Sequence, residues 1–256
     1  MQILSCGKYQ LSLHRPLVMG IVNLTPDSFS GDGLVGDVDR AIRHARQQFE
    51  AGADILDIGA ESSRPGAIPT PENEELRRLI PVLREISAWG IPVSVDTYKP
   101  QVMQAVLDLG ADIVNDVWAL RWSSESPDLT ARDVVMRHAN CGLCLMHMHR
   151  DPGSMQLAPM EGDVVDQVLS FLKHECESLK ARGINSSRIL LDPGIGFGKT
   201  PEQNFSLLAN QETLLALGHG LLVGWSRKRS LGWVLGDGGE HAAANSVANR
   251  RAVASA

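Results

Sequence analysis

Three acidic or amide side chains end short apolar runs of the sequence. Asp96 ends IPVSVDT, Asn115 lies in ADIVNDV, and Asp192 lies in RILLDPGIG. A carboxylate pairs well with adjacent ring N–H and amino donors, and buried polar groups of this kind are strongly selective. Together the three side chains could read the donor and acceptor edge of a heterocycle. Each could instead merely cap a following helix, but three such residues on neighbouring strands favour a binding site.

Positive charge is concentrated in SRKR, where three consecutive cations run from Arg227 to Arg229 in a chain of net charge −6. They could hold an anion, and Lys228 could donate to a ring carbonyl and nitrogen. A solvated basic turn is the alternative interpretation. Arg64, in ESSRPG, is a further cation that could pair with a carboxylate or a phosphate.

The segment DPGIGFGK contains three glycines, at positions 194, 196 and 198. It has neither the GxxxxGK[ST] pattern nor the Rossmann spacing, so it is a weak signal for phosphate binding. We expect the glycines to let the backbone turn close to a flat ligand. Phe197, which lies among them, could offer an apolar or stacking face.

Cysteine and histidine cluster in CGLCLMHMH, with Cys141 and Cys144 followed by His147 and His149. Metal binding or redox chemistry is conceivable, but no second cluster completes a zinc site. On a strand the two cysteines would face opposite ways. A role for His147 in lining the site is more plausible. Four cysteines in so long a chain do not form a disulfide framework, which favours a reduced, cytoplasmic setting.

The stretch LVMGIVNLTPDSFSGDG, residues 17–33, combines an apolar run with a loop of polar and turn-forming residues. No packing role requires Asn23, Thr25 and Asp27 so close together. The pattern predicts a buried strand that delivers a reactive loop.

Seven apolar runs alternate with helical segments, and no change of composition marks a linker. This alternation predicts parallel strands, and near-continuous apolar runs indicate strands buried on both faces. Polar residues gather after all seven runs, as in a TIM barrel, whereas a doubly wound sheet has its site at one switch point. We therefore predict an α/β fold with a TIM (β/α)8 barrel in one domain over residues 1–256, with an N-terminal hairpin over residues 2–13. The predicted strands cover 17–24, 54–60, 91–97, 111–117, 142–149, 188–196 and 220–226, and the main helices lie near 37–52, 72–89, 99–110, 128–139, 162–182, 201–217 and beyond 240.

Composition excludes several classes of protein. The 256 residues are 43% apolar and 21% charged, which is ordinary for a globular protein. A pI near 5.7 argues against a nucleic-acid partner. No apolar stretch is long enough to span a membrane, and the N-terminus lacks the features of a signal peptide.

Seven motifs together resemble the dihydropteroate synthase family: MGIVNLTPDSFSGDG, DIGAESSRPGA, SVDTYKP, VNDV, LMHMH, DPGIGFGK and GWSRKR. The resemblance covers almost the whole chain. It implies a TIM barrel that condenses 6-hydroxymethyl-7,8-dihydropterin pyrophosphate with p-aminobenzoate along an SN1-like path. It also implies Mg²⁺ as cofactor, inhibition by sulfonamides and folate biosynthesis as the process.

The resemblance also implies roles for individual residues. The predicted pterin site comprises Asp96, Asn115, Met146, Asp192 and Lys228. The predicted p-aminobenzoate site comprises Ser63, Arg64, Pro65, Phe197 and Arg229. Pyrophosphate is expected at Asn23 and Ser63, and the metal at Asn23. The residues with predicted catalytic roles are Asp27, Asp32, Asp96 and Lys228.

The chain departs from the family pattern in three places. The first loop has SFSGDG where SFSDGG is usual, which makes the role of Asp32 uncertain, and Ser63 replaces threonine. The family continues into an eighth strand and a closing helix, so we expect this sequence to be truncated at its C-terminus. Dimerisation through C-terminal helices stays open. The alternatives are a methyltetrahydrofolate–corrinoid methyltransferase and an inactive pterin-binding subunit.

Overall fold

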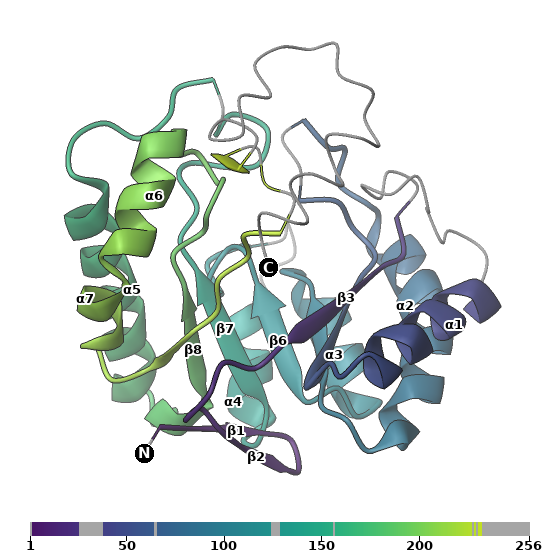
Figure 1. Cartoon of the computed structure of the whole chain (residues 1–256). Helices are drawn as coiled ribbons and strands as arrows, with labels where there is room; N and C mark the ends of the chain where they lie inside the picture. The colour runs from purple at the N-terminus through teal and green to yellow at the C-terminus, as the bar shows by residue number, and fades with distance from the viewer. Residues whose placement is uncertain are drawn as a thin grey trace.

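The computed structural model of the chain describes residues 2–25, 38–63, 66–123, 129–155, 157–226, 228, 230 and 231. A curled sheet of parallel strands forms its centre, in the order β3-β4-β5-β6-β7-β8-β9, and helices cover the outside of the sheet (Figure 1). Strand order therefore follows chain order throughout. This arrangement confirms the α/β fold and its TIM-barrel topology, with seven strands in the described part of the chain.

The strands of the sheet are β3 Met19–Asn23, β4 Ile55–Gly59, β5 Val93–Asp96, β6 Ile113–Asp116, β7 Gly142–Met146, β8 Ile189–Asp192 and β9 Gly220–Leu221. The helices are α1 Val38–Glu50, α2 Glu72–Ile86, α3 Pro100–Asp108, α4 Ala131–Arg137, α5 Val164–Ala181, α6 Pro201–Ala209 and α7 Gln211–Leu215, with short 3-10 helices at Ser87–Trp89 and Ser186–Arg188. In the part of the chain that the structure describes, no helix combines the length and apolarity needed to cross a membrane.

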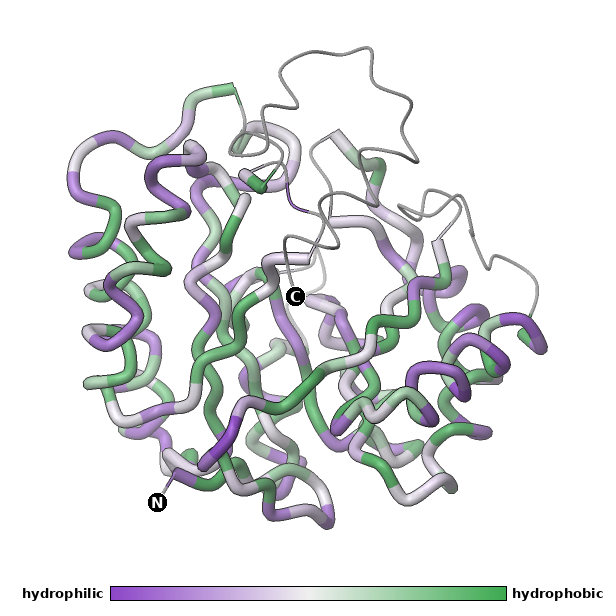
Figure 2. The backbone as a smooth tube through the Cα atoms, viewed as in Figure 1, coloured by the Kyte–Doolittle hydropathy of each residue, from purple (hydrophilic) through white to green (hydrophobic). Residues whose placement is uncertain are grey.

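The strands are apolar because both of their faces are covered. All five residues of β4 are buried, for example. The hydropathy colouring shows apolar residues along the strands and polar residues mainly on the outer sides of the helices (Figure 2). The main core lies between the sheet and the helices, and includes Leu56, Val95 and Leu143. Burial of this apolar area provides the main stabilisation of the fold.

A hairpin closes one end of the barrel. Strands β1 Ile3–Cys6 and β2 Tyr9–Ser12 pair antiparallel around Gly7, which has a φ of 55°. Leu4 and Cys6 pack in a second core cluster with Ile113 and Leu190 from the sheet strands. The hairpin lies at the amino ends of the sheet strands (Figure 1). Its apolar side chains fill the barrel interior there, so this end is referred to below as the closed end.

Several helices begin at residues that satisfy the free backbone N–H groups of the first turn. Thr200 and Gln203 form a capping box at the start of α6, with Pro201 as the first helical residue. Thr130 and Asp133 form the same arrangement at α4. These caps fix where the loops after the strands end, and the loop before α6 carries predicted site residues.

Several observed elements are shorter than the predicted ones, and local causes are clear for two of them. The helix expected over 201–217 is divided at Asn210, whose φ of −107° and ψ of 23° leave the helical range and whose side chain donates to the Ser206 carbonyl. The strand expected over 220–226 is paired only at Gly220–Leu221. Its neighbour β8 is followed by Pro193, which has no N–H to continue the ladder. The single helix predicted over 72–89 is observed as α2 followed by a short 3-10 helix.

Candidate active site

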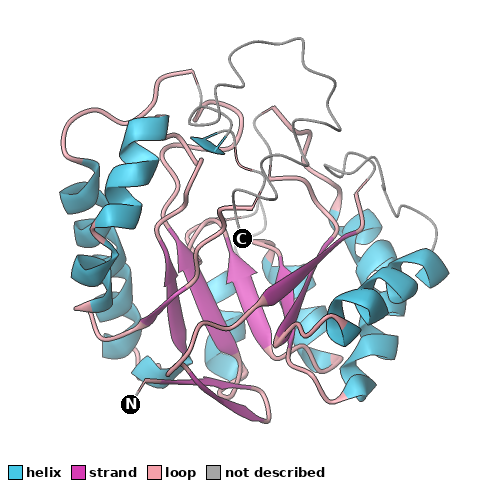
Figure 3. Ribbon diagram, viewed as in Figure 1, coloured by secondary structure: helices cyan, strands magenta, loops and turns pink. Residues whose placement is uncertain are grey.

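The strand register brings the predicted polar residues to one level. Asn23 pairs with Gly59, Gly59 with Asp96, and Asp96 with Asn115. Farther along the sheet, Met146 pairs with Asp192. The carboxyl ends of the strands all lie on the side of the sheet opposite the hairpin (Figure 3). These residues therefore line one edge of the sheet, which is referred to below as the mouth.

The β5–β6 side of the mouth is acidic. Burial raises the pKa of Asp96 well above its usual value, and the nearby carboxyl groups of Asp57, Glu75, Asp116 and Glu61 raise it further. Asp96 nevertheless keeps part of its surface exposed. Its ionised form is therefore unfavourable without a ligand, and a ligand that offers N–H donors or positive charge would stabilise it.

Asp57 is a site residue that the sequence reasoning missed. It is 4% exposed, and its Oδ2 lies 3.4 Å from the Nδ2 of Asn115, which donates to it. Burial raises its pKa, while the nearby polar groups of Ser94 and Asn115 oppose that shift. This bond uses one of the two N–H donors of the Asn115 amide, and the amide oxygen can accept from a ligand. The signal in the sequence was a charged residue inside the apolar run DILDIGA.

The β8 side of the mouth combines a carboxylate with a lysine. Asp192 accepts a 2.7 Å hydrogen bond from the Gly194 amide. Burial raises its pKa to about 6, although this bond and the charges of Lys228 and Lys199 act in the opposite direction. Burial also lowers the pKa of Lys228, against the attraction of Asp192 and Asp96. The charges of Asp192 and Asp96 both act on Lys228, so the lysine lies near the carboxylates of both sides.

Phe197 forms an apolar wall beside this charged group. The Nζ of Lys228 lies 4.6 Å from the centre of the Phe197 ring. Phe197 also packs in a cluster with Met146 and Val117. A flat ligand held by the polar groups would thus meet an aromatic ring and a methionine.

The glycines before and after Ile195 allow two close approaches. A Cβ on Gly194 would lie 1.8 Å from the carbonyl oxygen of His147, and one on Gly196 would lie 3.3 Å from Cδ of Lys228. Both residues have positive φ, 69° and 83°. The glycines therefore bring the loop against the β7 end and against Lys228, and packing of the protein itself accounts for them.

Comparison with known proteins agrees with this geometry. Residues 19–256 match the family described as "Pterin binding enzyme". The dihydropteroate synthase of Neisseria meningitidis serogroup C is 44% identical over 234 residues, which is 90% of this chain and 81% of that protein. The chain belongs to the dihydropteroate synthase family of pterin-binding enzymes.

Solved structures of the synthase family superpose closely on the chain. Xanthomonas albilineans dihydropteroate synthase with 4-aminobenzoic acid gives a TM-score of 0.83 at 44% identity, covering 98% of this chain and 86% of that one. The Burkholderia cenocepacia enzyme complexed with 7,8-dihydropteroate gives 0.79 at 41%, covering 98% and 88%. The Yersinia pestis enzyme with a sulfonamide drug complex gives 0.87 at 36%, covering 99% and 86%. The resemblance read from the sequence motifs is thereby confirmed.

Lys199 is a second residue near the mouth that the sequence motifs did not identify. Its Nζ donates to the carbonyl oxygens of His147, Gly194 and Phe197 at 3.3, 2.9 and 3.2 Å. It is 4% exposed, and burial lowers its pKa to about 7, opposed by Asp192. The ammonium group ties the glycine loop to the end of β7. The position of Lys199 at the end of the glycine-rich motif DPGIGFGK could have indicated this role.

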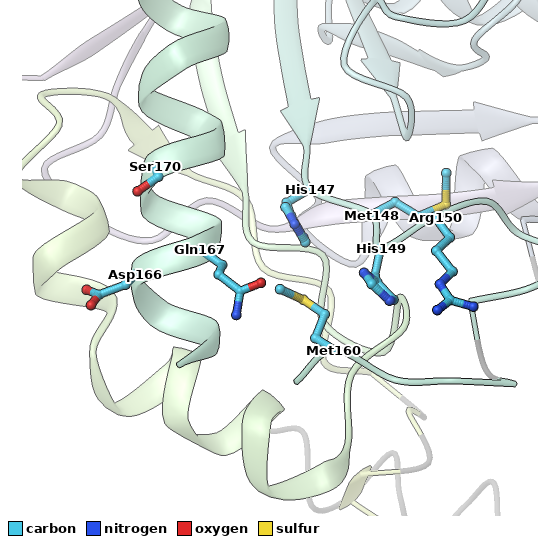
Figure 4. Close-up of a pocket in the computed structure, with 8 residues that line it drawn as sticks. All are labelled: His147, Met148, His149, Arg150, Met160, Asp166, Gln167 and Ser170. Atoms are coloured by element: carbon cyan, nitrogen blue, oxygen red, sulfur yellow. The ribbon is translucent and has the colours of Figure 1, made fainter. Parts of the chain in front are cut away.

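His147 occupies a different place from the one expected. Strand β7 ends at Met146, so His147 and His149 lie in the following loop. The His147 ring stands edge-on to Phe171 of α5 at 5.0 Å, and burial lowers its pKa to about 3. A cavity of about 450 Å³ lies between this loop and α5 (Figure 4). The ring lines this outer cavity, together with Met148, His149, Arg150, Met160, Asp166, Gln167 and Ser170.

The two cysteines of the CGLC segment are not paired with each other. Cys141 and Cys144 are buried free thiols. The Sγ of Cys141 accepts from the Arg188 guanidinium at 3.2 Å, whereas Cys144 packs in the core cluster at the closed end. Within the described ranges, no group of three or more His, Cys, Asp or Glu residues is arranged to hold a metal ion.

The remaining predicted residues divide into two sets. Asn23, at the end of β3, and Ser63, in the connection after β4, are both half-buried. The other predicted residues lie outside the described residues: Asp27, Asp32, Arg64, Pro65 and Arg229.

Proposed function

We propose that the chain condenses 6-hydroxymethyl-7,8-dihydropterin pyrophosphate with p-aminobenzoate, giving 7,8-dihydropteroate and pyrophosphate in folate biosynthesis. Its relatives support this proposal, since solved members contain 4-aminobenzoic acid and 7,8-dihydropteroate. The observation that carries the proposal is the group formed by Asp96, Asn115, Asp192 and Lys228 beside Phe197, because it offers carboxylates, an amide and an ammonium to one flat ligand.

Each residue of this group has a task that follows from its chemistry. The amino and ring N–H groups of a pterin can donate to Asp96 and Asp192, and Lys228 can donate to a ring carbonyl or nitrogen. The amide oxygen of Asn115 can accept, because the bond from one of its N–H groups to Asp57 orients the amide. A charged acceptor roughly doubles the strength of such a hydrogen bond. Met146 packs near the pterin in this arrangement.

The reaction needs no nucleophile from the protein. The bond between the pterin methylene and the pyrophosphate oxygen breaks, and its electron pair leaves with pyrophosphate. The arylamine nitrogen of p-aminobenzoate forms the new C–N bond and then loses a proton. In an SN1-like path the methylene carries positive charge, which the carboxylates of Asp96 and Asp192 would stabilise. Ser63, Phe197 and, by family motif, Arg64, Pro65 and Arg229 would border p-aminobenzoate, and Asp27 and Asp32 would belong to the first loop.

Mg²⁺ fits the donors only as an ion that arrives with the substrate. Mg²⁺ keeps several waters and takes one or two protein oxygens together with substrate phosphates. The half-buried Asn23 at the end of β3 provides one such oxygen. When bound, the ion would neutralise charge on the departing pyrophosphate. Asn23 and Ser63 would hold the phosphate groups themselves.

Three further properties belong to the same proposal. Sulfonamides would compete for the p-aminobenzoate region, as the sulfonamide complex of the Yersinia pestis relative suggests. The enzyme would act in the cytoplasm, where its buried thiols stay reduced. The family commonly dimerises, so a homodimer is one assembly to test, and no nucleic acid or membrane would take part.

A product assay tests the proposal. Purified chain, both substrates and Mg²⁺ should give dihydropteroate and pyrophosphate in equal amounts, and omission of either substrate should abolish both products. Pterin binding in a calorimeter without pyrophosphate release would instead indicate an inactive pterin-binding subunit. Methyl transfer from methyltetrahydrofolate to a corrinoid protein would overturn the choice of reaction.

A further inference from the structure

We propose that Lys99 is a positioning residue that fixes both ends of residues 61–70, which lie between β4 and α2 and are called the 61–70 connection below, and thereby places Ser63 for p-aminobenzoate. The identity of that ligand rests on the proposed function. The clamp itself rests on contacts among residues Glu61, Thr70, Glu75, Tyr98 and Lys99.

The Lys99 ammonium group uses its three donors on three different acceptors. It donates to Oε2 of Glu61, to the Thr70 carbonyl at 2.8 Å and to Oε2 of Glu75 at 2.6 Å. Glu61 is the first residue of the connection and Thr70 the last, whereas Glu75 lies in α2. One side chain thus ties the start of the connection, its end and the following helix to the segment before α3.

Glu61 completes the clamp from the other side. Its Oε2 accepts from the Thr70 amide at 2.8 Å, and its Oε1 accepts from the Tyr98 hydroxyl at 2.6 Å. Thr70 is therefore held through both its N–H and its carbonyl group. A connection whose two ends are fixed in this way has fewer conformations for Ser63 to sample, which lowers the entropy lost when a ligand binds.

Burial makes the cluster depend on the lysine. Lys99 is 4% exposed and Glu75 is 1% exposed. Burial raises the pKa of Glu75, and the adjacent Lys99 opposes that shift. Removal of one partner from a buried ion pair leaves an uncompensated charge. Without Lys99, Glu61 and Glu75 would lose the cation that they share, and the Thr70 carbonyl would lose its donor.

The clamp is joined to the pterin side of the mouth through a short segment. Asp96 ends β5, and Lys99 directly precedes α3, three residues farther along. Glu75 and Glu61 are also among the carboxylates that raise the pKa of Asp96. The segment SVDTYKP therefore carries a predicted pterin ligand at one end and the clamp for the p-aminobenzoate region at the other.

A purely structural ion pair is the alternative, and the chain provides a matched control for it. Arg132 of α4 pairs with the buried Glu175 of α5, with 2.8 Å between Nη2 and Oε2. This pair also joins two neighbouring elements, but it does not involve the 61–70 connection. Lys99→Met and Arg132→Met each remove one cation from a largely buried carboxylate.

Steady-state kinetics of the full chain separate the two interpretations. For Lys99→Met we expect the KM for p-aminobenzoate to rise at least tenfold, while the pterin pyrophosphate Kd from calorimetry changes less than threefold. Arg132→Met should leave both values within about twofold. Lys99→Arg keeps the charge and should recover most of the parental KM. Parental KM for p-aminobenzoate in folded Lys99→Met, or an equal rise in Arg132→Met, would overturn the proposal.

Hydrogen exchange tests the clamp independently of the reaction. Peptides that cover residues 61–71 should exchange faster in Lys99→Met than in the parent, and Arg132→Met should match the parent there. Unchanged exchange would refute the clamp even if the enzyme is active. If the parent chain forms no dihydropteroate, the proposed reaction fails while the exchange result still decides the clamp. If Lys99→Met does not fold, the milder variant Glu61→Gln takes its place in the test, and it should also exchange faster than the parent over residues 61–71.

Discussion

The two ends of the barrel use the same strands for opposite purposes. At the closed end, Leu4, Cys6, Ile113 and Leu190 form an apolar cluster. At the mouth, β5, β6 and β8 carry Asp96, Asn115 and Asp192 at or next to their last residues, and burial raises the pKa of both carboxyl groups. The closed end therefore stabilises the fold. At the mouth, burial of carboxyl groups lowers the stability but provides a charged binding surface. Substitutions at the two ends should consequently have opposite effects on folding and on catalysis.

The largest effect is expected from Asp96→Asn. A site built around a buried hydrogen-bonding group loses about 10⁴-fold or more in selectivity when the pairing fails, so kcat/KM for the pterin substrate should fall by about that factor. Stability should change in the opposite direction. Because the folded pKa of Asp96 is raised, its protonated form stabilises the fold at low pH, and that contribution is lost as pH rises through the folded pKa.

Urea unfolding at two pH values checks this prediction. The gain in the free energy of unfolding for Asp96→Asn should be larger at pH 8 than at pH 5. Asp108→Asn is the control, because the pKa of Asp108 is lowered by Gln104 and His138 and its ionised form is the favoured one. A loss of stability at pH 8 in Asp96→Asn would contradict the cost assigned to the mouth.

Leu4→Ala tests the opposite end. Leu4 is 1% exposed in the hairpin, and removal of a buried leucine side chain costs about 2–5 kcal/mol. The free energy of unfolding should fall by this amount, while KM for both substrates stays at the parental value. Ile3→Ala is the matched control on the same strand, since Ile3 is 43% exposed. A large KM change in folded Leu4→Ala would show that the two ends are not separable.

The polar residues of the mouth were easier to predict from the sequence than the hydrogen bonds that hold the neighbouring loops. Apolar runs that end in polar residues placed Asp96, Asn115 and Asp192 correctly at strand ends, because parallel strands in register bring such ends to one level. Lys99 and Lys199 were not predicted as structural cations. Their roles depend on which carbonyl and carboxylate oxygens the fold brings near them, and these lie up to 52 residues away. His147 was expected to line the mouth, but its ring packs against Phe171 of α5 and lines the outer cavity.

A smaller effect is expected from the ionisation of Asp192. Its folded pKa of about 6 exceeds the ordinary value of 3.8, so its contribution to stability is present below 3.8 and is lost as pH rises to about 6. Pterin binding should follow the opposite course, since the ionised carboxylate is the better acceptor. Calorimetry between pH 5 and 7.5 should show roughly tenfold tighter binding at the upper end. Asp192→Asn should flatten this dependence, and an unchanged slope in that variant would assign the titration to another group.

The smallest effect is expected at Phe197, where the two kinds of surface meet. Its ring packs with Met146 in an apolar cluster and also faces the Lys228 ammonium group at 4.6 Å. Phe197→Leu keeps the apolar volume but removes a cation–π contact of about 0.5–2 kcal/mol. KM for p-aminobenzoate should rise about threefold to tenfold, with a change in stability below about 1.5 kcal/mol. If stability falls while KM is unchanged, Phe197 is a packing residue, like those of the closed end, although it lies at the mouth.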